Sequence, residues 1–229
     1  MSESLQSTAA YLRLRDEIID CVLQPGRQTT EGELATRLGL GKAAVRVALV
    51  RLAQEGLVQT MGRRGYLIKE IKLGDVAEIF TVRAMLEAEA ARLAAGRVDT
   101  ALLQTLQERC ARFGQSGQEV ASREFRDAHT ALHLTIARAA GSERLLAMLE
   151  QNMREVGRLL QLGLGWLQPE QLAEHRHDEL IDALASGDAQ AAELAARRHV
   201  EVAQKMVLSA LYSSPEVRGL SMPISAKNV

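Results

Sequence analysis

The strongest constraint in this sequence is that only one short stretch departs from the helical spacing of apolar residues. Two runs, Val58–Thr60 and Tyr66–Lys69, read as short strands on either side of the turn Met61–Gly65. Elsewhere the strong helix formers Ala, Leu, Glu and Arg dominate, and aromatic residues make up only 3% of the chain. This combination argues against a β-sandwich or barrel and predicts a mainly α fold.

Three helical segments precede this hairpin. We expect them at Tyr11–Val22, Glu31–Leu38 and Lys42–Gln54. Residues at helical spacing in the first segment are Leu12, Ile18, Ile19 and Val22, and those facing inward in the third are Val45, Leu49 and Leu52. Thr30 and Glu33 form a capping box at the start of the second segment, and Gly39 ends it. Three short helices followed by a hairpin predict a winged helix-turn-helix, which we place at residues 1–72.

The rest of the chain has a helical pattern with short connections. We expect helices at Asp75–Ala95, Thr100–Gly114, Glu119–Ala140, Ser142–Gly163, Gln168–Ser186 and Ala189–Leu211. Such a pattern predicts an antiparallel all-helical bundle over residues 75–212. Residues 213–229 are rich in Pro, Ser and Gly, which predicts a flexible tail.

Positive charge is concentrated in the recognition helix and hairpin of the predicted winged fold. The whole chain is nearly neutral, with 28 basic and 29 acidic residues. Residues 37–72, however, contain eight basic and two acidic residues, a net charge of +6. A basic stripe on a recognition helix and wing is the electrostatic footprint of a nucleic-acid-binding protein.

Six of these basic side chains are candidate DNA contacts: Arg37, Lys42, Arg46, Arg51, Arg63 and Arg64. Lys42 begins the third helix and Arg46 lies one turn later, so both can reach the major groove. The arginines at 37 and 51 can reach the phosphate backbone on either side. The two at the hairpin tip suit the minor groove or phosphates. The alternative is a solvated basic face, but the coincidence of helix-turn-helix, hairpin and charge favours DNA.

A run of short motifs follows the same segment. They are Pro25-Gly26, Glu31, Leu34-Ala35, Leu38-Gly39, Val45-Arg46, Ala48-Leu49, Arg51-Leu52, Glu55-Gly56-Leu57-Val58 and Arg64-Gly65. On these residues the first third of the chain resembles the GntR family of transcriptional regulators. The chain departs from the family pattern where Gly41-Lys42-Ala43-Ala44 replaces Ser-Arg-Thr-Pro and Val47 replaces Glu. The chain therefore lacks the hydroxyl groups of the family's Ser and Thr. It also has Lys42 in place of an Arg, which can bind two acceptors at once.

All five histidines lie in the second part of the chain. His129 and His133 are four residues apart, so one helical turn places both imidazoles on the same face, as a metal-ligand pair requires. His177 and His199 fall on the fifth and sixth predicted helices, and an antiparallel bundle can bring such positions together. His175 is two residues before His177 and faces elsewhere, so we interpret it as a surface residue. Histidines without a pattern are more often surface or core residues than ligands.

A second set of motifs surrounds these histidines. They are Leu132-His133, Ala139-Ala140-Gly141-Ser142, Arg176-His177, Ile181, Ala183-Leu184, Gly187-Asp188 and His199. From about Val82 to Val200 the chain thus resembles the helical FCD effector domain of FadR-type GntR regulators, in its six-helix, VanR-like form. The resemblance implies a divalent metal bound by His133, His177 and His199.

His129 stands where the family usually has a metal-binding Asp. Either His129 ligates the metal, giving four imidazoles, or the site has three; the first interpretation is favoured. Four neutral nitrogen ligands suit zinc or nickel over magnesium or calcium.

The same resemblance implies a small carboxylic-acid effector in the bundle cavity, close to the metal. Arg83 matches a family Arg-x-x-x-Glu, which makes it the candidate effector contact. It could instead pair with Glu87 as plain structure. The function predicted is a ligand-responsive transcriptional regulator. We expect a homodimer on palindromic double-stranded operator DNA.

The competing function is a helical metalloenzyme that uses the histidine cluster. His129 and His133 lack the Glu of H-E-x-x-H, and no P-loop or G-x-S-x-G motif is present, so we expect no enzyme. Cys21 and Cys110 are isolated, which argues against a disulfide framework or a thiolate metal site. Without a signal peptide or an apolar run of about 20 residues, we expect no membrane partner and a cytoplasmic protein.

Overall fold

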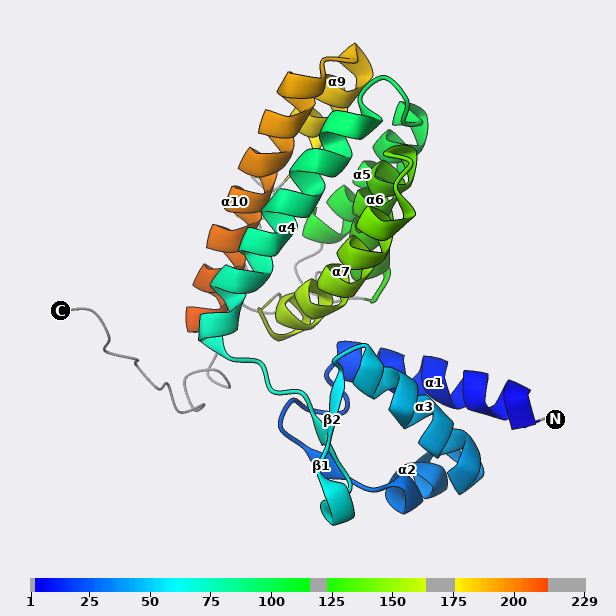
Figure 1. The fold of residues 1–229 in the computed structure, drawn as a ribbon. Helices are drawn as coiled ribbons and strands as arrows, with labels where there is room; N and C mark the ends of the chain where they lie inside the picture. The colour runs from blue at the N-terminus through cyan, green and yellow to red at the C-terminus, as the bar shows by residue number, and fades with distance from the viewer. Residues whose placement is uncertain (1–2, 116–122, 164–175, 214–229) are drawn as a thin grey trace. The chain divides into compact units, whose positions relative to one another are not determined.

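The structure is a computed structural model that describes residues 3–115, 123–163 and 176–213 of the 229-residue chain. Its internal contacts divide the chain into two compact units. We call Met1–Lys72 the N-terminal unit and Leu73–Val229 the C-terminal unit, and describe each by itself (Figure 1).

The N-terminal unit combines helices with a small antiparallel sheet. Its helices are α1 (Glu3–Ile19), α2 (Glu31–Leu38) and α3 (Lys42–Gln54), and its strands are β1 (Gln28–Thr29), β2 (Val58–Thr60) and β3 (Tyr66–Ile68). The strands lie in the order β1-β3-β2, and the short 3-10 turn η1 (Gly62–Arg64) joins β2 to β3. This is the winged helix-turn-helix that the sequence predicts.

The two helices of the helix-turn-helix have the predicted bounds, because local signals fix their ends. The Glu33 N–H donates to Thr30 Oγ1 at 3.2 Å, which is the N-cap half of the predicted capping box. Gly39 ends α2 in the left-handed conformation, with φ 66°.

The first helix is longer than predicted and packs a different face. It begins at Glu3 rather than near Tyr11, and it ends at Ile19. Its buried side chains are Ala10, Tyr11, Leu14 and Ile18. Leu12 and Val22, which the prediction placed among the helically spaced apolar residues, are 41% and 54% exposed. The polar residues before Tyr11 carry no apolar periodicity, so the sequence pattern missed the first turns.

Packing between these elements forms one core in the N-terminal unit. It includes Leu14, Ile18, Leu34, Val45, Leu49, Leu52 and Ile68. The predicted inward residues of α3 are therefore buried, and burial of this face leaves the opposite face of α3 outside. Strand β1 was not predicted, because a two-residue strand has no periodicity; it is stabilised by pairing with β3.

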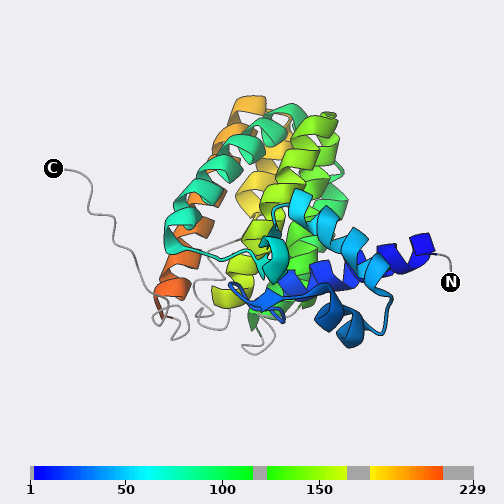
Figure 2. The same ribbon diagram turned by 60° about the horizontal axis from the view of Figure 1, so that its bottom comes forward.

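The C-terminal unit is a helical bundle, as predicted. Its described helices are α4 (Leu73–Ala94), α5 (Thr100–Gln115), α6 (Arg123–Ala139), α7 (Glu143–Gly163), α9 (Asp178–Ser186) and α10 (Ala189–Ser213). Helices α4 and α10 run antiparallel, side by side in both views (Figures 1 and 2). Buried alanines on both, among them Ala88 and Ala196, allow this close approach.

Two predicted helix ends need correction. The helix predicted from Gln168 begins at Asp178: Arg176 and His177 are not helical, and residues 168–175 lie outside the described part of the chain. Acidic residues in the first turn, Asp178 and Glu179, suit a helix start here. Helix α10 includes Ser213, which the prediction assigned to the tail; residues 214–229 also lie outside the described part. No helix among the described residues is long and apolar enough to span a bilayer.

Candidate DNA interface and histidine cluster

The outward face of α3 carries the first of the predicted DNA contacts. Lys42 and Arg46 are both exposed on this helix, and Arg63 and Arg64 are exposed in the turn η1 of the wing. Gly41 precedes α3 and makes no side-chain cap, so the first backbone N–H groups of the helix are open to an anion such as a phosphate. The structure thus exposes four of the six predicted contacts, two on α3 and two in the turn η1 of the same unit.

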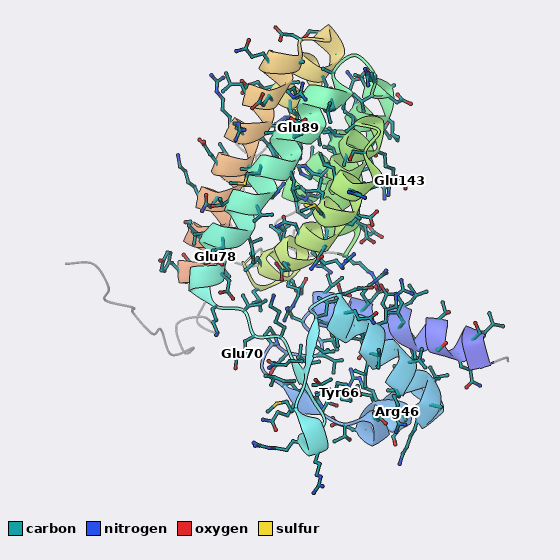
Figure 3. The ribbon with its side chains drawn as sticks, in the orientation of Figure 1. Arg46, Tyr66, Glu70, Glu78, Glu89 and Glu143 are labelled. Atoms are coloured by element: carbon teal, nitrogen blue, oxygen red, sulfur yellow. The ribbon has the colours of Figure 1, made fainter. Side chains whose placement is uncertain are left out.

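Arg46, which is labelled in Figure 3, is held in place by an ion pair with Glu31 of α2. Its Nε lies 2.9 and 3.0 Å from the two carboxylate oxygens of Glu31, and its Nη2 donates to Oε2 at 2.8 Å. The Tyr66 hydroxyl, on β3, donates to Glu31 Oε1 at 3.1 Å. The hydrogen bond from Arg46 is the main reason that the pKa of Glu31 is lowered.

The two predicted phosphate contacts at the edges of this surface are engaged within the unit. Arg37 pairs with Glu17 at 2.8 Å. Arg51 pairs with Glu55 at 3.3 Å, and its guanidinium lies 3.6 Å from the ring centre of Tyr11. These contacts connect α1 with α2 and α3, so both arginines stabilise the packing of these helices in the free protein.

The four histidines proposed as ligands lie together in the C-terminal unit. They are His129 and His133 on α6, His177 directly before α9, and His199 on α10. Each is buried, with at most 7% of its surface exposed, and their candidate ligand nitrogens all lie within 4.8 Å of one another. The correction at α9 makes His177 its N-cap rather than a residue within the helix. The fifth histidine, His175, lies outside the described residues.

The proton on His177 can be assigned from its neighbours. Both the backbone N–H and Nδ1 of His177 contact Gln107 Oε1, at 3.2 and 2.5 Å. An oxygen can only accept, so Nδ1 carries the proton and Nε2 has its lone pair available. Gln107 lies on α5 and is 5% exposed. Gln107 was not predicted as a site residue, because no motif in the sequence identifies an outer partner of a histidine.

His133 is oriented in the same way by α4. Its Nδ1 lies 3.0 Å from Glu87 Oε2, and Arg83 Nη2 lies 3.0 Å from its Nε2. A guanidinium can only donate, so Nε2 accepts and Nδ1–H faces the carboxylate. Burial lowers the pKa of His133, against the attraction of Glu87, which favours the neutral imidazole that metals bind.

Arg83 is buried and also pairs with Glu87, Nε to Oε1 at 2.6 Å. The structural pairing considered for Arg83 is therefore present. Burial raises the pKa of Glu87, but the charge and hydrogen bond of Arg83, together with the contact with His133, outweigh this effect and hold the pKa of Glu87 at about 2. Glu87 is therefore a carboxylate that fixes both a cation and an imidazole.

The spacing of the nitrogens fits a metal ion. His133 Nε2 lies 3.2 Å from His129 Nε2 and 3.3 Å from His177 Nε2. Zinc–nitrogen bonds of about 2.0–2.1 Å in a tetrahedron place neighbouring donors about 3.3–3.4 Å apart. An all-imidazole donor set suits zinc or nickel.

Further arginines of the bundle differ in their surroundings. Arg158 on α7 and Arg126 on α6 are buried, and Arg126 donates to Gln161. Arg138 is exposed and lies 3.8 Å from Glu150. Arg126 carried no motif and was not predicted as an interior residue.

Two family models match most of the chain. The model of bacterial regulatory proteins of the gntR family matches residues 6–68. The FCD domain model matches residues 78–202, more than half of the chain.

Individual proteins agree with these matches. A "Probable D-xylose utilization operon transcriptional repressor" of Paenarthrobacter nicotinovorans is 30% identical over 207 residues, covering 87% of this chain and 89% of that protein. The repressor RspR of Escherichia coli K12 is 23% identical over 191 residues, covering 83% and 84%. Among solved structures, E. coli McbR/YncC has a TM-score of 0.77 at 21% identity, covering 91% and 98%; this similarity concerns the fold.

The two named relatives are transcriptional regulators and not enzymes, which answers the metalloenzyme alternative. With both family models matched in the order expected, the chain belongs to the GntR family and is a DNA-binding transcriptional regulator whose C-terminal unit is an FCD domain.

Proposed function

We propose that this regulator responds to a small carboxylic acid bound at a divalent metal site in its FCD domain. One observation carries the metal: four histidines are buried together, and their candidate ligand nitrogens all lie within 4.8 Å of one another, close enough to share one cation. His129, His133, His177 and His199 would hold that cation, and zinc or nickel suits four neutral nitrogens.

The effector site follows from the charges beside this cluster. Arg83 Nη2 is 3.0 Å from His133 Nε2, so a guanidinium adjoins the nitrogens that would bind the metal. When bound, the metal supplies a Lewis-acidic site for one carboxylate oxygen. Arg83, kept in place by Glu87, would donate to a second oxygen. Two adjacent cationic groups in a buried site favour an anion over a neutral ligand.

On the DNA side, we propose that the protein binds a palindromic operator as a homodimer. One recognition helix reads only a short half-site, and two-fold pairing of two copies matches a two-fold operator. Lys42 and Arg46 would face the major groove, while Arg63 and Arg64 would contact the minor groove or phosphates. Arg37 and Arg51 would reach phosphates only after leaving their present ion pairs.

Effector binding would alter operator affinity by favouring one arrangement of the two DNA-binding units over another. The test begins with a thermal-shift screen of small carboxylic acids, with and without a chelator. Acids that stabilise the metal-loaded protein are then added to complexes with duplex DNA selected from a random-sequence pool. We expect an acid that stabilises only in the presence of metal and that changes DNA affinity several-fold.

His133→Ala is the diagnostic variant and Asp127→Ala, exposed on the same helix, is its matched control. The histidine variant should lose bound metal by elemental analysis and lose the acid's effect, while still binding DNA. Wild-type metal content in His133→Ala would refute the site. Stabilisation by acids that persists under chelation would refute the role of the metal in effector binding.

A further inference from the structure

The outward face of α3 carries an apolar strip where the GntR motif is altered. Ala43, Val47 and Val50 are exposed, the two valines by 56% and 48%. At about 100° per residue, these positions fall within about 60° of one another around the helix axis. Arg46 lies at the edge of the same face. The strip is therefore on the side of α3 that a recognition helix presents to the major groove.

Arg46 is fixed so that one particular edge of its guanidinium points outward. Glu31 takes the edge formed by Nε and Nη2 with three contacts of 2.8 to 3.0 Å. The described contacts of Arg46 leave Nη1 and the second hydrogen of Nη2 unused. This end-on pair of donors has the geometry for two parallel hydrogen bonds to guanine O6 and N7.

We propose that α3 reads a guanine with Arg46 and, at a neighbouring base pair, a thymine methyl group with Val47 and Ala43. Thymine is the base that presents a methyl group in the major groove, and apolar side chains recognise it by contact. This inference rests on the DNA-binding role of α3 and adds the identity of two bases. Val47 replaces the Glu usual in the family, so the contact belongs to this chain.

Glu31 is a positioning residue in this arrangement, acting through Arg46. Its negative charge lies in a unit that must approach phosphates, where it disfavours binding to any sequence. Its contribution is orientation: it holds a flexible side chain in the conformation that reads guanine. Glu31→Gln should thus raise affinity for random duplexes and lower the preference for the guanine at least about fivefold.

The experiment is selection of duplexes from a random-sequence pool by the full-length protein, followed by affinity measurements on the selected site. We expect a half-site with an invariant guanine and a neighbouring thymine. Arg46→Ala should lose the guanine preference and keep the thymine preference, and Val47→Ala should do the reverse. Replacing that thymine by deoxyuridine removes only its methyl group. This should weaken wild-type binding about fourfold, as expected for one buried methyl group, and leave Val47→Ala unchanged.

Val22→Ala is the matched control, because Val22 is equally exposed in the same unit but lies outside α3. It should select the wild-type site and keep the deoxyuridine effect. The proposal is overturned if wild-type binding ignores deoxyuridine at every thymine of the site, or if Arg46→Ala retains the guanine preference. Both results leave DNA binding itself intact, whereas selection of no common sequence would remove the DNA-binding role as well.

Discussion

At the histidine cluster, each imidazole has two nitrogens, and the neighbours decide which one faces the centre. Gln107 accepts a hydrogen bond from His177, and Glu87 Oε2 lies 3.0 Å from His133 Nδ1. Such outer partners set the orientation and basicity of a ligand. The proposal that His129 is a fourth ligand rests on its position, with its Nε2 3.2 Å from His133 Nε2.

His129→Ala separates the four-histidine site from the three-histidine site. We expect metal affinity to fall by more than about tenfold, since loss of a direct ligand should cost at least as much as loss of an outer partner. Competition with a chelator measures the change, and Asp127→Ala is the control. Retention of wild-type affinity would favour three ligands.

Gln107→Leu tests the outer partner of His177. The change keeps the side-chain volume but removes the oxygen that orders Nδ1 and the His177 backbone N–H. We expect metal affinity to fall about 10- to 100-fold. Gln104→Leu, exposed on the same helix, should leave affinity unchanged; an equal loss in both variants would contradict a specific role for Gln107.

At the scale of the elements, the conformation of the wing depends on the turn between β2 and β3, where Gly65 lies. Gly65 follows η1 with φ 95°, and a Cβ there would lie 2.4 Å from the backbone oxygen of Thr29. That oxygen belongs to β1, so the close approach links the turn to the sheet. The motif Arg64-Gly65 marks this turn in the sequence, but the neighbour that requires glycine comes from a distant strand.

Gly65→Ala should therefore destabilise the N-terminal unit by about 1–3 kcal/mol, through backbone strain and displacement of β1. Gly62→Ala is the matched control, because its φ of 58° is also positive but no atom lies within 4 Å of its Cβ position. Denaturant unfolding compares the two. Similar losses of stability in both variants would show that conformation alone, and not the contact with Thr29, requires glycine at position 65.

At the scale of the whole molecule, the proposed metal would join elements far apart in the sequence. Its ligands come from α6, from the residue before α9 and from α10. A metal bound only by the folded state stabilises that state, by about 2.7 kcal/mol at a free concentration 100 times its dissociation constant.

Removal of the metal by a chelator should therefore lower the melting temperature of the C-terminal unit and leave that of the N-terminal unit unchanged. Calorimetry with separate transitions for the two units checks this. His177→Ala should show the lowered transition without chelator and no further change with it. A chelator effect of wild-type size in that variant would contradict metal binding at the cluster.

The sequence by itself determined the elements whose signals are local. The N-cap at Thr30 and the glycine at position 39 predicted the two ends of α2, and the apolar period predicted α3. The motif from Ile181 to Asp188 predicted the position of α9, but not the residue at which this helix begins. The spacing of His129 and His133 marked the cluster, because four residues make one helical turn wherever the helix lies.

Only the tertiary structure decided the contacts between residues that are remote in the sequence. Glu31 and Arg46 are 15 residues apart, His177 and Gln107 are 70 apart, and β1 exists only because β3 lies beside it. A single sequence does not show how far apart two residues lie in space when they are remote along the chain. Hydrogen-bond direction and burial depend on that distance, so the orientation of Arg46 and the proton positions on the histidines followed only from the packed fold.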